Sequence, residues 1–131
     1  MYPKKKLLIA AGIAVTITVC ATASAPPREF KNLKVLPKNI GSKELSKIMV
    51  DDFADGLGVS CGFCHAENKD THKPDYASDE KPEKNIAREM MRMTGKINKR
   101  YFKIDHPVIG NSSLAVTCST CHNGAAFPGE K

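Results

Sequence analysis

The pentapeptide C-x-x-C-H occurs twice in this chain of 131 residues, as Cys61-Gly62-Phe63-Cys64-His65 and as Cys118-Ser119-Thr120-Cys121-His122. Two cysteines three positions apart can each form a thioether bond to one edge of a porphyrin, and the histidine that follows reaches the iron. With five cysteines and four histidines in the chain, a given cysteine acquires this pattern by chance with a frequency of about 0.001. The repeat therefore predicts two covalently attached c-type haems.

The motifs assign six residues to the two predicted cofactors. The covalent attachment points are Cys61, Cys64, Cys118 and Cys121, and the iron ligands are His65 and His122. The alternatives are disulfide bonds or a zinc site built from the same side chains. A disulfide framework gives no reason for a histidine after each pair, and the two motifs are further apart than the pairs of a common zinc ribbon.

An amphipathic helix is predicted before each motif. The first begins at Ser42, a preferred N-cap residue, and ends at Gly56 and Gly58. The second begins near Pro82, since proline suits a first helical turn, and closes at Tyr101 and Phe102. The apolar stripe of the first helix is Leu45, Ile48, Met49, Phe53 and Leu57, and that of the second is Ile86, Met90, Met93 and Ile97. Residues 66–83 have no apolar period and are predicted to be a surface loop.

These patterns predict an all-α fold: a small dihaem c-type cytochrome built from two helix–loop–CxxCH units, with few or no strands. Residues 42–131 form the predicted haem domain, and residues 24–41 an extended segment, because apolar and polar residues alternate from Phe30 to Pro37. A domain of about 100 residues without tryptophan buries little apolar surface. We therefore expect the chain to fold poorly without its haems.

Residues 1–23 are predicted to be a signal peptide or a membrane anchor. Three lysines precede an uncharged apolar stretch, and small residues follow it. Membrane anchoring through residues 7–23 and lipid attachment at Cys20 are the alternatives to a removed signal peptide. Each one predicts that the rest of the chain lies in the periplasm or at the outer face of the cytoplasmic membrane. Without the first 23 residues 17 basic and 14 acidic residues remain, and no nucleic-acid-binding pattern is present.

The ligand on the far side of each iron decides what a haem does. Methionine closes that position and raises the reduction potential. Met49 lies on the apolar stripe of the first helix. On the second helix Met90 and Met93 are equal candidates by periodicity, whereas Met91 points about 100° away from Met90. The remaining histidines, His72 and His106, are expected to be surface residues.

Four segments resemble the photosynthetic reaction centre cytochrome c subunit family. They are Phe30-Lys31-Asn32-Leu33-Lys34-Val35-Leu36-Pro37, Leu57 to His65, Ala87 to Thr94 with Ile97-Asn98, and Val116 to Gly124. In that family each haem packs along a helix that carries its methionine ligand. The resemblance therefore implies Met49 as ligand of the first haem and Met90 as ligand of the second.

The family's photosynthetic subunit carries four haems, whereas this chain has two attachment motifs. The family's additional histidine ligand also has no match, since Ile104 stands near its place. These differences favour a free-standing two-haem relative serving respiration.

The predicted function is extracytoplasmic transfer of single electrons between redox partners, with no enzymatic activity. The alternatives are a dihaem peroxidase-like enzyme with one open haem and a haem subunit of a larger membrane redox complex. Basic residues recur at helical spacing along the second helix: Lys84, Arg88, Arg92, Lys96, Arg100 and Lys103. They predict a docking surface for an acidic partner near Arg88, Arg92 and Lys96, because complementary charge speeds encounter.

Overall fold

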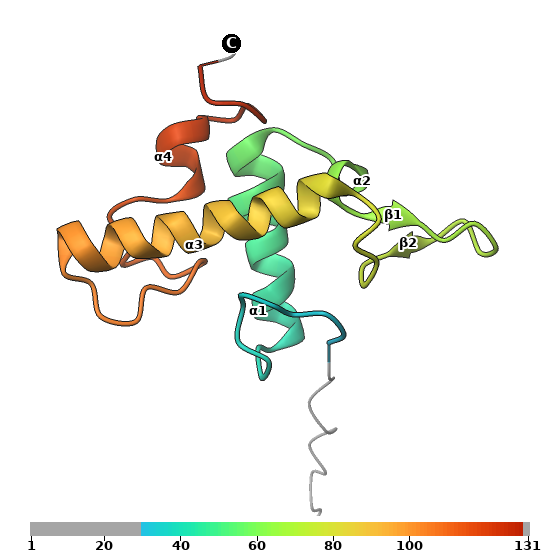
Figure 1. Ribbon diagram of the computed structural model, residues 1–131, viewed down its shortest axis with the longest axis horizontal. Helices are drawn as coiled ribbons and strands as arrows, with labels where there is room; N and C mark the ends of the chain where they lie inside the picture. The colour runs from blue at the N-terminus through green and yellow to red at the C-terminus, as the bar shows by residue number, and fades with distance from the viewer. Residues whose placement is uncertain (1–29, 130–131) are drawn as a thin grey trace, which may run out of the picture.

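The computed structural model describes residues 30–129, so the predictions for residues 1–23 and for Cys20 lie outside the described part of the chain. The described residues are mostly helical, as predicted (Figure 1). The elements are α1 (Ser42–Lys47), η1 (Ile48–Asp55), α2 (Cys61–Cys64), β1 (Ala66–Glu67), β2 (Pro74–Asp75), α3 (Pro82–Phe102) and α4 (Cys118–His122). The two short strands pair antiparallel, with Ala66 opposite Asp75, in a hairpin that projects at the right of Figure 1.

The first predicted helix is α1 continued directly by η1. Ser42 is its first helical residue and Gly41 its cap, so the predicted N-cap is one residue too late. The η1 segment is π-helical, a form that is rare and occurs frequently at functional sites. The predicted stripe faces inward: Ile48 is buried, and Met49 and Phe53 are half-buried.

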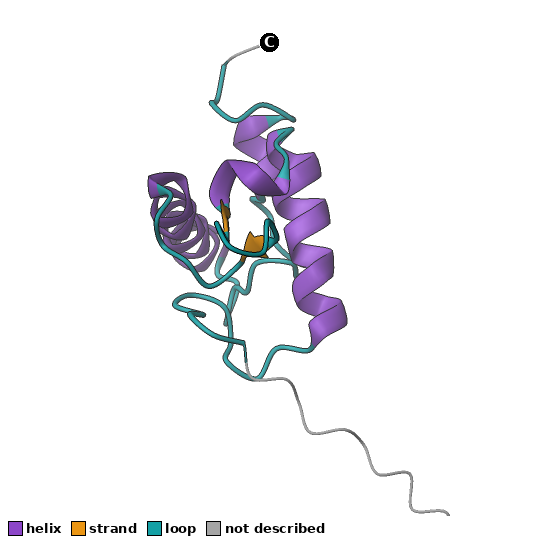
Figure 2. Cartoon of the chain, turned by 90° about the vertical axis from the view of Figure 1, so that its right-hand side faces the viewer, coloured by secondary structure: helices purple, strands orange, loops and turns teal. Residues whose placement is uncertain are grey.

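Helix α3 lies across the first helix in Figure 1, and Figure 2 shows it nearly end-on beside that helix. Pro82 begins it, and Lys103 ends it in the left-handed conformation. Its buried residues are Lys84, Arg88, Met91, Thr94 and Asn98. The predicted apolar stripe lies on the other side, where Ile86, Met90 and Met93 are exposed. The expectation that Lys84 and Arg88 belong to an exposed basic face is therefore wrong.

The core of the described residues is small. Its buried hydrophobic cluster is Leu36, Ile40, Ile48, Met91 and Ile109. Residues 30–41, predicted to be extended, form turns without a strand, and they contribute Leu36 and Ile40 to this cluster. A cluster of this size stabilises a domain of about 100 residues only weakly.

The segment after the second motif is fixed to the end of the first helix. The backbone N–H of Gly124 donates a hydrogen bond of 3.0 Å to the carbonyl oxygen of Gly56. Gly58 has a φ of +64°, and a Cβ atom there would lie 2.1 Å from the carbonyl oxygen of Gly124. Only glycine allows this close approach. Both C-x-x-C-H motifs are thus held at the same end of one helix.

Candidate functional site

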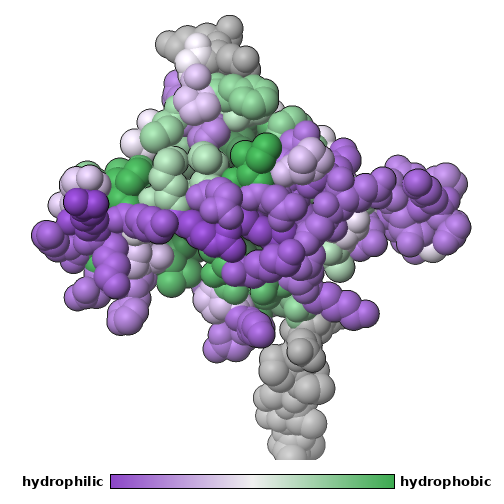
Figure 3. Space-filling view, viewed as in Figure 1, coloured by the Kyte–Doolittle hydropathy of each residue, from purple (hydrophilic) through white to green (hydrophobic). Residues whose placement is uncertain are grey.

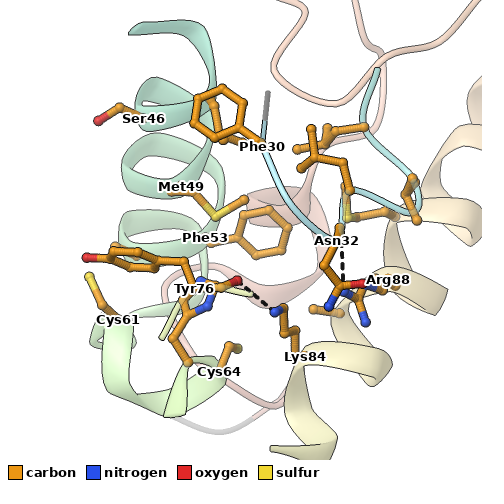
Figure 4. A pocket seen from close by; sticks show the side chains of 18 of the residues that line it. Phe30, Asn32, Ser46, Met49, Phe53, Cys61, Cys64, Tyr76, Lys84 and Arg88 are labelled. Carbon is orange, nitrogen blue, oxygen red and sulfur yellow. Dashed lines mark hydrogen bonds between the residues drawn. The ribbon is translucent and has the colours of Figure 1, made fainter. Parts of the chain in front are cut away.

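A cavity of about 490 Å³ lies beside the first motif, within the size range of cofactor pockets. Its wall includes Met49, Cys61, Cys64 and His65, so four of the predicted site residues meet in one space. Figure 4 shows Met49 and Phe53 pointing into it from the first helix, opposite side chains of α3. Apolar side chains that surround the small core, such as Phe53, also line the cavity. The centre of the molecule is therefore completed by whatever occupies it.

The first motif forms the short helix α2, which places its cysteines along one edge of the cavity. The backbone N–H of His65 donates to the carbonyl oxygen of Cys61 over 3.0 Å. Cys61 is exposed and Cys64 is half-buried. Burial raises the pKa of the Cys64 thiol, and the Glu83 carboxylate adds to that effect. Both cysteines are free thiols, which leaves their sulfur atoms available for thioether bonds.

His65 is half-buried at the wall of this cavity. Its ring meets the ring of Tyr76 edge to face, with centroids 5.0 Å apart. Its Nδ1 atom is buried without a hydrogen-bond partner among residues 30–129. Burial lowers the pKa of His65, and the charges of Lys84 and Arg88 lower it further. The imidazole is therefore neutral at pH 7, the form that binds a metal.

A cluster of charged residues closes the cavity on the side of α3. Asp79 accepts hydrogen bonds from Lys34 (2.6 Å), Arg88 (2.8 Å) and Asn32 (2.8 Å). Lys84 donates to the carbonyl oxygens of Tyr76 and Ser78, the first of which is drawn in Figure 4. The hydrogen bond from Lys34 is the main reason that the pKa of Asp79 lies far below its ordinary value.

This charged cluster joins three segments of the chain. They are the turns around residues 30–36, the loop before α3, and α3 itself, and all three contribute to the cavity wall.

The second motif forms α4, which begins with a capping box between Thr117 and Thr120. His122 is half-buried, and its Nδ1–H donates to the carbonyl oxygen of Ala125 over 3.0 Å. That hydrogen bond fixes the tautomer and leaves Nε2 as a lone-pair donor, as in metal-binding histidines. Cys118 is half-buried and Cys121 exposed, both as free thiols. Burial raises the pKa of Cys118 to about 11, with a smaller contribution from Asp52.

The methionines predicted for the second site lie on the open side of α3. Met90 is 38% exposed and Met93 44% exposed, and Ile86 on the same side is 58% exposed. Figure 3 shows hydrophobic surface gathered along α3 on the side of α4. Met91 is buried in the core and lines the cavity of the first site. One helix thus presents Met91 to the first site and Met90 and Met93 to the opposite side.

Asn98 connects α3 to the segment that leads into the second motif. Its side chain is completely buried. Its Nδ2 donates to the carbonyl oxygens of Thr94 and Val116, and its Oδ1 accepts from the backbone N–H groups of Ala115 and Val116. These bonds position the residues just before Cys118.

The residues present fit c-type haem. The first cavity combines two free thiols, a neutral imidazole and a thioether in one largely apolar enclosure, which is the donor set of a His/Met haem. At the second motif the thiols and the imidazole have the same spacing, and the exposed methionines lie on the neighbouring helix. Within residues 30–129 no three His, Cys, Asp or Glu side chains gather at a metal-ion site.

The other predicted positions fall outside these groups. His72 is exposed and pairs with Glu67 across the hairpin, with 2.8 Å between Nδ1 and Oε1. His106 is also exposed. The expectation of surface histidines is confirmed for both.

Sequence reasoning missed Lys84 and Asn98 as residues that build the sites, and it placed Arg88 at the surface. The signal for these residues is a polar face at helical spacing that includes Met91, and apolar periodicity assigns that face to the outer side of α3.

Comparison with known proteins finds a matching family. The family described as "Photosynthetic reaction centre cytochrome C subunit" matches residues 15–131. Cytochrome c-554 of Chloroflexus aurantiacus is 34% identical over 94 residues, which cover 72% of this chain and 20% of that protein.

Two photosynthetic reaction center cytochrome c subunits are also similar, those of Rubrivivax gelatinosus and Roseobacter denitrificans. Each is 36% identical over 70 residues, or 53% of this chain and 16% and 17% of the relatives. The aligned part of the chain thus spans at most about a fifth of each relative.

Proposed function

Because the chain belongs to the photosynthetic reaction centre cytochrome c subunit family, we propose that it is a dihaem c-type cytochrome that carries single electrons between redox partners. The observation that carries this proposal is the cavity in which Met49, His65 and the first cysteine pair meet. The second C-x-x-C-H motif, with its oriented His122, supports a second haem.

When bound, a c-type haem supplies an iron that exchanges one electron. The cysteine thiols of the two motifs would hold the two haems through thioether bonds. His65 and His122 would be iron ligands, and Met49 and Met90 would be the further ligands that the family resemblance implies.

Closure of both irons by methionine favours electron transfer over catalysis. A reduced donor protein loses one electron to the chain, and the chain gives it to an oxidised acceptor protein. The half-buried Met49 and the apolar residues beside it give the first site a largely apolar wall.

The exposed basic side of α3 is the proposed docking surface for an acidic redox partner. Arg92 and Lys96 are exposed, whereas Arg88 is buried and excluded from this surface. The surface continues with further exposed basic residues, namely Lys99, Arg100 and Lys103. Such a surface raises the rate of encounter at low ionic strength.

We place the domain outside the cytoplasm, where haem is attached to cysteine. Residues 1–23 act either as a signal peptide that is removed after export or as a membrane anchor that is retained. No helix within residues 30–129 combines the length and the apolar character that a membrane crossing requires.

Haem content and ligation test the proposal. Purified protein from a host with cytochrome c maturation should contain two covalent haems per chain, both low-spin. The Cys61→Ala/Cys64→Ala and Cys118→Ala/Cys121→Ala variants should each lose one of them. Zinc or disulfides at the motifs would contradict the proposal. A high-spin ferric haem that binds cyanide promptly would instead support the peroxidase-like enzyme, and co-purification with membranes after a high-salt wash would support a subunit of a larger complex.

A further inference from the structure

The two histidines differ in what holds their second ring nitrogen. His122 donates its Nδ1–H to the carbonyl oxygen of Ala125, whereas Nδ1 of His65 is buried with no partner among residues 30–129. A hydrogen bond at this nitrogen makes an imidazole a stronger donor to its metal. His122 therefore stabilises ferric iron more than His65 does.

The charges near the two sites also differ. Lys84 is 9% exposed and Arg88 is 7% exposed, and both line the first cavity together with His65. They share the carboxylate of Asp79 with Lys34, so three cations meet one anion, and Asp75 adds a weaker effect on Lys84.

These cations lie beside the first iron ligand, because Lys84 and Arg88 line the same cavity as His65. A carboxylate acts on a cysteine of each motif, Glu83 on Cys64 and Asp52 on Cys118. The feature that distinguishes the first site is therefore the pair of buried cations in its wall.

Enclosure acts in the same direction as charge. The first site is a cavity with mostly apolar walls, whereas the second faces the exposed side of α3. Ferric haem carries one more positive charge than ferrous haem. Buried cations, low polarity and a weaker histidine donor therefore all favour the reduced form at the first site.

Resting on the dihaem function proposed above, we propose that the first haem has a higher midpoint potential than the second, and that Lys84 and Arg88 are the residues that raise it. A half-reduced molecule then holds its single electron on the His65 side. An electron accepted at the second site passes to the first, so that the second haem is oxidised as the first is reduced.

Optical redox titration of the full-length holoprotein tests this order. Met49→His and Met90→His identify the two waves, because replacing methionine by histidine lowers the potential of the haem concerned. The wave that Met49→His shifts should be the higher one in the wild type. Arg88→Gln should reduce the equilibrium constant for reduction of the first haem about tenfold, which lowers its midpoint potential by about 59 mV for one electron. Arg92→Gln removes an equal charge from the exposed side of the same helix. It should change the equilibrium constant for reduction of the first haem less than twofold.

Asp79→Asn supplies a test that misfolding does not imitate. It removes the anion that the cations share, so it should raise the potential of the first haem, opposite in sign to Arg88→Gln. If Arg88→Gln binds too little haem to titrate, Asp79→Asn alone tests whether the charged cluster sets the potential of the first haem. The proposal is overturned if the Met90→His wave is the higher one, or if both Arg88→Gln and Asp79→Asn leave the first wave in place. Either result leaves two bound haems, whereas loss of the proposed function would appear as missing haem.

Discussion

The first site is a cavity walled by several segments, whereas the second lies beside an exposed helix face, although both use the same pentapeptide. Around His65 the chain forms a cavity whose walls come from the turns at residues 30–36, from η1 and from α3. Around His122 it forms one short helix beside exposed methionines. Under the proposed function, a haem in the first site would replace missing core, whereas a haem in the second would cover a helix face. The same motif would then serve folding at one place and function mainly as an electron site at the other.

Removing each haem in turn should have the largest effect on the free energy of unfolding. Without the first haem, the described part of the chain retains only the small hydrophobic core around Ile48 and Met91. The Cys61→Ala/Cys64→Ala variant should lose more than about 5 kcal/mol, the lower end of a typical domain's stability, and with it cooperative unfolding. The Cys118→Ala/Cys121→Ala variant should stay cooperative and lose about 2 kcal/mol, the worth of covering one large side chain.

Urea unfolding followed by far-UV circular dichroism measures both variants. The wild-type holoprotein is the common reference, and covalent haem is counted in each sample. Equal losses of stability in the two variants would contradict the division into a cavity site and a site on an exposed helix face.

Asn98 gives the next largest effect, and it should act on the second site. Asn98→Ala leaves the backbone groups of Ala115 and Val116 without their partners, and a buried unpaired group costs about 1–3 kcal/mol. We expect a loss of about 3 kcal/mol in the free energy of unfolding, together with a shift in the potential of the second haem. Lys99→Ala, at the exposed neighbouring position, is the control. A shift confined to the first haem would contradict this assignment.

Gly58 tests the contact that brings the two motifs together. Alanine there has to adopt a positive φ, which costs roughly 1–2 kcal/mol, and its Cβ meets the carbonyl oxygen of Gly124. Gly58→Ala should therefore destabilise the holoprotein by about 2 kcal/mol and slow electron exchange between the haems. Gly62→Ala is the matched control, because a Cβ there meets only the Ser60 hydroxyl at 3.9 Å. Chemical denaturation gives the stability, and flash photolysis gives the exchange rate. Equal stability in the two variants would show that the segment at Gly124 moves aside freely.

The elements themselves could be predicted from the sequence. The two helices before the motifs, the all-α class and the inward stripe with Met49 follow from apolar periodicity and from glycine and proline signals, and the structure contains them. Apolar periodicity fails on α3 because it assumes that the apolar face is the buried one. Here Arg88 and Asn98 are buried, since an ion pair and hydrogen bonds satisfy them, while Met90 and Met93 are exposed.

Contacts between distant segments could not be predicted. Asp79 lies in the polar stretch that was expected to be a plain surface loop, yet it holds Lys34 and Arg88. Nothing in the local pattern near Asp79 indicates its partners, because they come from other parts of the chain. The π-helical turns of η1 and the close approach of Gly58 to Gly124 likewise depend on packing and leave no sequence period.

The smallest expected effect is a pH dependence confined to the first site. The pKa of Asp79 is held far below its ordinary value, first by the hydrogen bond from Lys34 and also by Arg88. A carboxyl group whose pKa is lower in the folded state contributes stability above its unfolded pKa of about 3.9, and this is lost as the pH falls through the folded value. The difference in stability between the wild type and Asp79→Asn should therefore be constant from about pH 7 to pH 5 and shrink below about pH 4. Because the partners of Asp79 line the first cavity, absorbance changes of the first haem should accompany this loss of the stability difference.

Glu89→Gln is the control, because it breaks the exposed ion pair with Arg92. The stability difference between the wild type and Glu89→Gln should not shrink in the same way below about pH 4. If it shrinks equally, general acid titration is the cause, and not the wall of the first site.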